Sequence, residues 1–354
     1  MTRRTRVSKI ILGAFAAFIL ASTASAEERT LLTADGTLYH VQSGFYRDLE
    51  PQGTSAQPGD FVLRWDSRDQ SGAVQSGLIP GTNNRDPKDQ MDLAYDSVSQ
   101  SLVLVWNDRL QVLNSIAFAI FQKGIWTQSQ LLPSGVFSFA SNPRILITHQ
   151  QTMDSDAEGN DVVANRSIIS MIWWEDSFKP RARFAPIFVE GGSFNLSDIQ
   201  IYDLPELVGS QSIEQTAILE NPLFATPTIQ QEGLSSSVLA TFGDVATQSI
   251  HVVRIGFPSD FRHVIDPMHG RHVPVILGHS GSPLLLAVPP TPIRLGTIVG
   301  SSYFPTVYWQ SDPDHVNFSV SNGTSWTDTR SLALGGPITA DAAIDLIRRM
   351  AIQN

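Results

Sequence analysis

The sequence predicts an all-β protein, a β-propeller of roughly six or seven blades with a short C-terminal helix. Short apolar runs separated by turn-forming residues dominate the 354-residue chain. A tryptophan-marked pattern also occurs twice, over residues 103–131 and 307–332: a strand ending in Trp, a polar turn, an alternating strand, and then Gly, Trp and Thr. A unit that recurs in this way shares its core with its neighbours, which is the organisation of a repeat fold.

A second repeat indicates the same fold. Pro143, Pro227 and Pro305 each follow a nearby Phe and lead into β-branched residues, and they are 84 and 78 residues apart. Half of either spacing is about the length of one four-stranded blade, ~40–45 residues. Proline is tolerated at the first residue of a strand, because its missing N–H need not join the ladder. Short, evenly spaced strands also suit a pair of β-sandwiches, which is the alternative fold.

Each strand is expected where an apolar or alternating run lies between turn-forming residues. The first hairpin spans residues 30–41 around Asp35-Gly36, a dipeptide typical of tight turns. Residues 66–91 are expected to form a long loop with one strand near Leu78, and residues 197–220 fit either a loop or a short helix. Further strands are expected at residues 61–65, 91–95, 102–106, 116–121, 126–132, 145–148, 168–174, 183–189, 237–242, 250–255, 273–277, 284–288, 295–299 and 306–309.

Helical periodicity is clear at the C-terminus, over residues 340–352. Thr339 can cap this helix, and Ile344, Ile347 and Ala351 fall on one face. We expect that face to pack on the rim of the sheets. Because no linker-like stretch interrupts the remainder, residues 27–354 are expected to form a single domain.

Residues 1–26 have the pattern of an export signal. Four basic residues precede the apolar run at residues 10–20, and Ala24-Ser25-Ala26 forms a small-residue cleavage site. The apolar run is shorter than the ~20 residues that a membrane-spanning helix needs, and no later segment reaches that length. The sequence therefore predicts an exported protein, periplasmic or extracellular, with no membrane span after cleavage.

The charge of the remaining chain excludes some partners. The signal segment contains four of the 24 Lys and Arg residues and no acidic residue, which leaves 20 basic against 34 acidic residues and a formal charge of −14. Such acidity argues against a nucleic-acid partner, which requires a basic face. The chain has no cysteine, so disulfides and thiol chemistry are excluded as well.

One segment resembles a motif of a known family. Ser319-Val-Ser321-Asn-Gly323-Thr-Ser-Trp326 is similar to the Asp box of sialidase-like β-propellers, with Ser321 in the place of the Asp, and Gly124-Ile-Trp126 is a shortened version of it. The resemblance implies a structural turn between the last two strands of a blade, with the Trp packed between blades and no role in catalysis. Sialidases of this fold bind the substrate carboxylate through three arginines, and Arg144 lies in the segment most similar to that of the first one.

An acidic loop has the pattern of a calcium site. Asp154, Asp156, Glu158 and Asp161 alternate around Gly159. Calcium requires many oxygen ligands, and alternate carboxylates can converge on one point where a glycine makes a sharp turn. Calcium is accordingly the cofactor that the sequence suggests. The alternative is a solvated acidic hairpin without a metal.

A histidine-rich segment could bind a transition metal. His263, Asp266, His269 and His272 recur at multiples of three residues. Imidazole and carboxylate groups suit zinc, copper or iron. Pro267 breaks the helical geometry that would bring the four together, so the alternative is a polar loop.

One segment is similar to the nucleophile segment of trypsin-like proteases. It runs Gly278-His279-Ser280-Gly281-Ser282-Pro283, and the resemblance implies that Ser280 would be the nucleophile. His149 is the candidate general base, and no triad Asp can be identified from the sequence. The alternative is a turn between two strands.

Two adjacent tryptophans could bind a sugar. Trp173 and Trp174 precede Glu175 and Asp176, so a ring stacked on indole would lie beside carboxylates. The alternative places one Trp in the core and the other at the rim.

These features favour an exported binding or scaffold protein over an enzyme. A carbohydrate or cell-surface ligand is expected at one mouth of the propeller channel, where loops of several blades meet. The alternatives are a sialidase-like glycoside hydrolase on the same fold and a trypsin-like serine protease that uses Ser280.

Overall fold

The computed structural model describes most of the chain between residues 27 and 333. The described residues are 27–49, 59–85, 87–110, 113–132, 139–155, 161–176, 180–190, 192–194, 196, 199–204, 213–221, 234–244, 247, 249–258, 275–279, 284–285, 296–299, 305–312, 314–320 and 327–333. The expected signal segment and the expected helix at residues 340–352 lie outside this set.

The described residues form five antiparallel sheets and one short helix, α2 (Tyr46–Leu49). Sheet 1 contains β1 (Glu28–Leu32), β2 (Leu38–Phe45), β3 (Phe61–Arg68) and β4 (Val74–Leu78). Sheet 2 contains β5 (Lys88–Asp96), β6 (Ser101–Leu110), β7 (Leu113–Gln122), β8 (Ile125–Trp126) and β9 (Gln130–Leu132). Sheet 3 contains β10 (Phe139–Ser155), β11 (Asp161–Asp176), β12 (Arg181–Glu190), β13 (Ser193–Phe194) and β14 (Tyr202–Asp203).

The last two sheets follow in chain order. Sheet 4 contains β15 (Ile213–Asn221), β16 (Leu234–Asp244), β17 (Ser249–Pro258), β18 (Val275–His279) and β19 (Leu284–Leu285). Sheet 5 contains β20 (Gly296–Val299), β21 (Pro305–Asp312), β22 (His315–Val320) and β23 (Arg330–Ala333). In every sheet the first four strands pair in sequence order, so each sheet is a simple meander.

The turns between strands form where the sequence supplies the right residues. Gly36 has φ 78° in the β1–β2 turn, and Lys123 and Gly124 have φ 52° and 84° in the β7–β8 turn. Positive φ at both central residues is the geometry of a type I′ hairpin turn, whose twist matches that of the strands. After this turn the Trp126 indole lies 6.4 Å from that of Trp65, between sheets 1 and 2.

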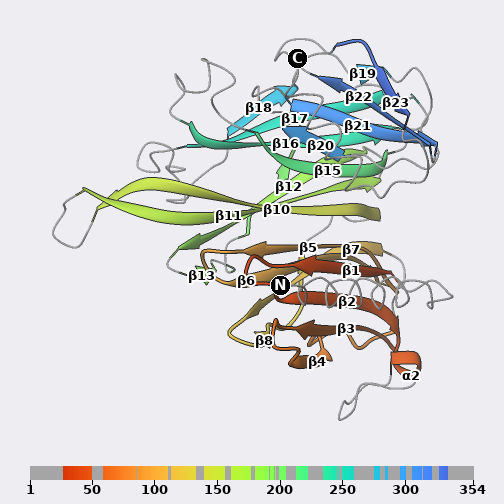
Figure 1. The fold of residues 1–354 in the computed structure, drawn as a ribbon, viewed down its shortest axis with the longest axis vertical. Helices are drawn as coiled ribbons and strands as arrows, with labels where there is room; N and C mark the ends of the chain where they lie inside the picture. Colours follow the sequence, from red (N-terminus) through yellow and green to blue (C-terminus); the bar gives the residue numbers. More distant parts are fainter. Residues whose placement is uncertain are drawn as a thin grey trace, which may run out of the picture.

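The sheets are stacked face to face (Figure 1), and each of sheets 1 to 4 shares a core with its neighbour. Successive side chains of a strand point to opposite faces of the sheet, so one strand can contribute to two cores. Leu102, Leu104 and Trp106 of β6 pack toward sheet 1, whereas Val103 and Val105 pack toward sheet 3. Sheet 3 behaves in the same way, since Trp173 faces sheet 2 and Trp174 faces sheet 4.

This arrangement differs from a pair of β-sandwiches. A two-sheet sandwich buries one face of each sheet, but sheets 2 and 3 each contribute to two cores. The first strands of the sheets also form a row: β1 contacts β5, β5 contacts β10, β10 contacts β15, and β15 contacts β20.

The described residues form fewer sheets than the six or seven blades that the sequence predicts. The described residues form five sheets, whose first strands begin at residues 28, 88, 139, 213 and 296, at spacings of 60, 51, 74 and 83 residues. Each spacing exceeds the ~40–45 residues assumed for one blade. Strands longer than expected account for part of the difference, because β10 and β11 have 17 and 16 residues.

Most expected strands are present, with shifted ends. The ambiguous residues 197–220 contain β14 and the start of β15 rather than a described helix. Pro143 was expected to begin a strand, but it lies inside β10, where the pairing register shifts between Ser141 and Arg144. Proline is accepted there because a bulge leaves one residue outside the ladder.

Candidate functional site

Polar residues gather where the first strands of sheets 1, 2 and 3 lie side by side. Glu27, just before β1, accepts hydrogen bonds from the backbone N–H groups of Gln90 and Met91, the latter at 2.9 Å. Its carboxylate is also 2.8 Å from Nη2 of Arg29. Glu27 therefore links the first strands of two neighbouring sheets.

A backbone irregularity recurs in these strands. The register shifts between Asp89 and Asp92 in β5 and between Ser141 and Arg144 in β10, and a similar shift occurs near the start of β15. Gln90 and Asn142 have left-handed φ values of 51° and 54°. Such bulges commonly redirect side chains near functional sites.

Each bulge is bonded to the next strand in the row. The Asn142 N–H donates to Oε1 of Gln90 at 2.7 Å, and the Asn142 side chain donates to the Ile213 carbonyl at 3.2 Å. Thr216 of β15 donates to the Asn142 carbonyl. These bonds fix the positions of the residues that follow each bulge, Asp92 and Arg144.

Asp92 is held by backbone amides. It accepts hydrogen bonds from the N–H of Leu93 at 3.1 Å and from that of Ile145 at 3.0 Å. Burial raises the pKa of Asp92, although the guanidinium groups of Arg144 and Arg29 and the Ile145 amide oppose the rise. A carboxyl group of this kind can change protonation closer to neutral pH than an ordinary Asp.

Arg144 lies next to Asp92 along the row. Burial lowers the pKa of its guanidinium, while Asp92 opposes that effect. Its one hydrogen bond with a described residue runs from Nη1 to the Pro143 carbonyl, at 2.7 Å. Arginine carries five N–H donors on its guanidinium group. With one of them bonded to a described residue, most of these donors remain available to a ligand within the described part of the chain.

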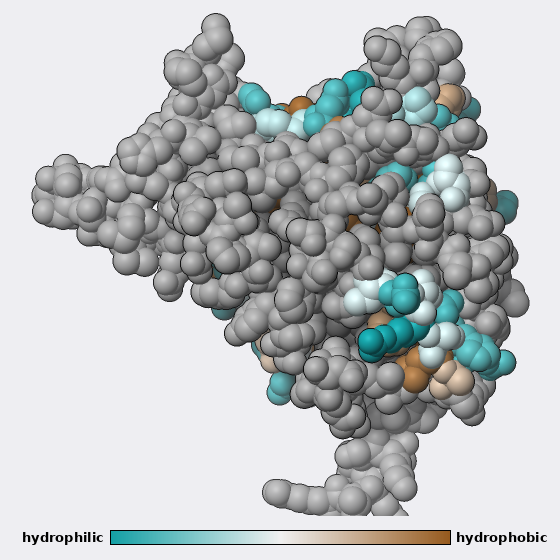
Figure 2. Space-filling model, turned by 90° about the horizontal axis from the view of Figure 1, so that it is seen from above, coloured by the Kyte–Doolittle hydropathy of each residue, from teal (hydrophilic) through white to brown (hydrophobic). Residues whose placement is uncertain are grey.

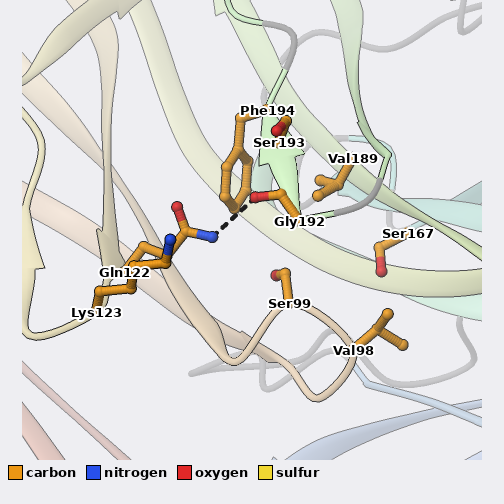
Figure 3. A pocket seen from close by; sticks show the side chains of 9 residues that line it. All are labelled: Val98, Ser99, Gln122, Lys123, Ser167, Val189, Gly192, Ser193 and Phe194. Atoms are coloured by element: carbon orange, nitrogen blue, oxygen red, sulfur yellow. Dashed lines mark hydrogen bonds between the residues drawn. The ribbon is translucent and has the colours of Figure 1, made fainter.

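A cavity lies at the other end of the same strands. It has a volume of about 760 Å³ and is bordered by the β5–β6, β7–β8 and β12–β13 turns. Figure 3 shows Gln122 donating to the Gly192 carbonyl on one side, at 2.8 Å, with Ser99 and Ser167 on the other. Lys123 and Phe194 also line it.

A buried carboxylate lies behind this cavity. Asp96 is fully buried and accepts hydrogen bonds from Ser99 and from Ser167, the latter at 2.9 Å. Nε2 of His149 lies 2.9 Å from the same carboxylate. Burial alone would raise the pKa of Asp96, but the hydrogen bonds from Ser99, His149 and Ser167 outweigh it and hold that pKa below its usual value.

The structure gives His149 a carboxylate partner that the sequence did not identify. A protease triad requires such a pair, with the serine on the free side of the imidazole. Ser167, which faces His149 across the β10–β11 pair, bonds instead to Asp96. Ser280, the nucleophile implied by resemblance, lies outside the described residues.

The predicted sugar-binding tryptophans are core residues. Trp173 and Trp174 are 1% and 4% exposed, so neither offers an indole face to a ligand. Glu175 is fully buried and forms ion pairs with Arg181 and Arg183, at 3.2 and 3.0 Å. Asp176 is exposed at the end of β11.

The predicted metal sites are largely outside the described part of the chain. Asp154 is the last residue but one of β10 and Asp161 begins β11, but Asp156 and Glu158 lie outside the described residues. His263, Asp266, His269 and His272 are not described either. Among described residues, no group of three His, Asp or Glu side chains could hold a metal ion.

The surface gives little further indication of a partner. On the face seen in Figure 2, the described residues are a mixture of hydrophilic and hydrophobic side chains. Within the described part of the chain, no helix has the length and apolar character to cross a membrane.

Comparison with known proteins gives no family. No protein-family model matches this sequence, and no curated protein matches it. Its structure is similar to the crystal structure of a protein of unknown function from Dyadobacter fermentans, at 7% sequence identity. The match covers 87% of this chain and 82% of that chain, with a TM-score of 0.43.

Proposed function

We propose that the chain is an exported β-propeller that binds a carboxylate-bearing carbohydrate at the row of first strands. The described sheets would be its blades. Four-stranded meanders that share cores and place their first strands in a row support this fold. The sequence pattern of residues 1–26 supports export.

The Arg144 guanidinium, most of whose donors have no partner among the described residues, is the observation that supports a carboxylate-bearing ligand. A half-buried charge is costly unless it is paired, and Arg144 forms no ion pair with a described residue. A planar carboxylate can take two parallel N–H bonds from such a fork. Arg29 adds a second guanidinium to the same row, as its influence on the pKa of Arg144 indicates.

Galacturonic acid and galactose make a matched pair of probes, because they differ by the carboxylate. We expect the acid to bind at least ~10-fold more tightly, as a charge-assisted bidentate pair contributes on the order of 1.5–3 kcal/mol. Arg144→Met should remove this excess in calorimetric titration. Arg181→Met is the control, since Arg181 already pairs with Glu175 and Asp203. Equal affinity for acid and galactose in the natural protein would contradict the proposal.

The proposed binding should strengthen at lower pH. When Asp92 is ionised it repels the ligand carboxylate, and this repulsion disappears as pH falls through the raised pKa of Asp92. The ligand itself stays ionised down to a pH of about 3.5. Asp92→Asn should flatten the pH dependence, which the same titration measures at several pH values.

A glycoside hydrolase is the second candidate, and the raised pKa of Asp92 favours it. A carboxyl group that stays protonated can serve as the general acid at a glycosidic oxygen. Nitrophenyl glycosides of uronic acids would report turnover. If Asp92→Asn loses this turnover but still binds galacturonic acid, the result would support a hydrolase. If the natural protein shows no turnover, the result would support a binding protein instead.

A further inference from the structure

The cavity between sheets 2 and 3 has the size and composition of a small-molecule site. Its volume of about 760 Å³ falls within the range of ligand pockets, ~300–1,000 Å³. Val98 and Phe194 give it apolar surface, and serine and glutamine side chains supply its polar groups. The cavity is separate from the proposed carboxylate site at Asp92 and Arg144. Asp96, which lies behind the cavity, follows Asp92 by four residues on β5, about 13 Å in an extended strand.

The hydrogen-bond directions in this cavity are fixed by Asp96. An ionised carboxylate can accept hydrogen bonds but cannot donate them. Ser99 and Ser167 therefore give their protons to Asp96. Ser167 is only 1% exposed, whereas Ser99 is half-buried, so the Ser99 oxygen is the one that keeps its lone pairs for the cavity. His149 and the Val98 N–H also donate to this carboxylate. The buried group is thus well satisfied and holds both serines in place.

Gln122 adds a second acceptor. Its amide nitrogen is bonded to the Gly192 carbonyl, which leaves the amide oxygen for a ligand. A molecule that bonds to both the Ser99 hydroxyl oxygen and the Gln122 amide oxygen must supply donors, and Ser193 adds a further hydroxyl group to the lining. The Lys123 ammonium group at the border disfavours cationic donors.

We propose that this cavity binds a neutral polyol, such as a sugar ring, whose hydroxyl groups donate to Ser99 and Gln122. The apolar walls contact the C–H faces of the ring. Polyols combine several hydroxyl donors with such faces, so they match both parts of the lining. This site does not depend on the carboxylate site at Arg144.

Saturation-transfer NMR with glucose and myo-inositol tests the polyol site in the full-length protein. Ser99→Ala removes one acceptor oxygen and should weaken binding about tenfold. Ser43→Ala is the control, because Ser43 also donates a side-chain hydrogen bond, to the Lys88 carbonyl, but does not line the cavity. Gln122→Met, with a side chain of similar length, should weaken binding as well and serves if Ser99→Ala does not fold.

Three results would overturn the proposal. They are no binding of either polyol to the natural protein, unchanged binding in both variants, and preferential binding of ethylammonium. The two proposed sites can be told apart, because Arg144→Met should leave polyol binding unchanged. Ser99→Ala should in turn leave the excess affinity for galacturonic acid over galactose unchanged.

Discussion

The carboxylate of Asp96 holds several residues in place beside the proposed polyol cavity. Asp96 joins its own turn to Ser167 and His149, which are 71 and 53 residues away in the chain. The sequence predicts the turn at residues 96–100, but it gives no sign of these partners. A hydrogen bond between distant residues depends on how sheets stack, which periodicity along one strand does not specify.

Asp96→Asn should lower the free energy of unfolding by about 1–3 kcal/mol at neutral pH, because a buried acceptor for several donors is lost. The folded-state pKa of Asp96 lies below its usual value, so the stability that it contributes is present above a pH of about 4. That contribution disappears as pH falls through the folded-state pKa. Urea unfolding at several pH values measures both effects.

Asp35→Asn provides the comparison. Hydrogen bonds from Thr33 and Thr37 lower the pKa of Asp35 as well, but this carboxylate is exposed. Its substitution should therefore cost less stability than that of Asp96. A loss in Asp96→Asn that is as large at pH 3 as at pH 7 would contradict the role of the ionised carboxylate.

At the scale of single elements, the bulges in β5 and β10 place Asp92 and Arg144. Both contain a non-glycine residue in left-handed conformation, which costs roughly 1–2 kcal/mol for an L-residue. The strain is retained because Gln90 and Asn142 bond to neighbouring strands. The proposed carboxylate site therefore depends on local backbone strain that cross-strand bonds hold in place.

Substitutions at Gln90 should reverse the usual order of alanine and glycine. In an ordinary strand, glycine is less stable than alanine by about 0.5–1 kcal/mol. At Gln90, with φ 51°, Gln90→Gly should be more stable than Gln90→Ala by about 1 kcal/mol, because glycine accepts this conformation freely. Both variants lose the same side-chain bonds, so thermal unfolding isolates the backbone effect.

Ala94→Gly, on the same strand, is the matched control. Ala94 is not among the residues with positive φ, so this change should destabilise the protein by the ordinary amount. If Gln90→Ala were the more stable of the two Gln90 variants, the strained conformation would not be a feature of the folded protein in solution.

The sequence predicts hairpins better than it predicts sites. Gly36 and Gly124 are turn residues with positive φ, and both turns form as expected. Asp92 is not among the site residues that the sequence predicts. A charged residue within an expected strand, at residues 91–95, could have drawn notice to it, but strand alternation alone could not show that Arg144 lies beside it. The Trp pair at residues 173–174 was ambiguous because aromatic residues suit both cores and ligand sites.

At the scale of the whole molecule, shared cores make the stacked sheets interdependent. Removing one sheet would expose one apolar face of each neighbour, as with Val103 and Val105 of sheet 2. The sequence predicted this organisation from its repeats, and the structure shows it across sheets 1 to 4. The described residues form five sheets where six or seven blades were expected, and an average repeat length does not predict the long strands β10 and β11.

Substitutions in different cores should therefore affect one unfolding transition. Leu104→Ala lies between sheets 1 and 2, and Ile172→Ala between sheets 3 and 4, and both side chains are fully buried. Each should cost about 2–5 kcal/mol and shift the whole transition. Circular dichroism and tryptophan fluorescence should report the same midpoint in each variant, whereas separate midpoints would indicate independent domains.

The length of the β10–β11 hairpin has a practical consequence. Its strands pair as far as Ser155 and Asp161, but the pairing with β12 ends at Arg166 and Glu190, so the outer part projects as a two-stranded ribbon (Figure 1). The ribbon can change length without altering the pairing of β11 with β12. A purification tag, a fluorophore or a small folded module could be inserted between Ser155 and Asp161, where a label would report on the protein without entering either proposed ligand site.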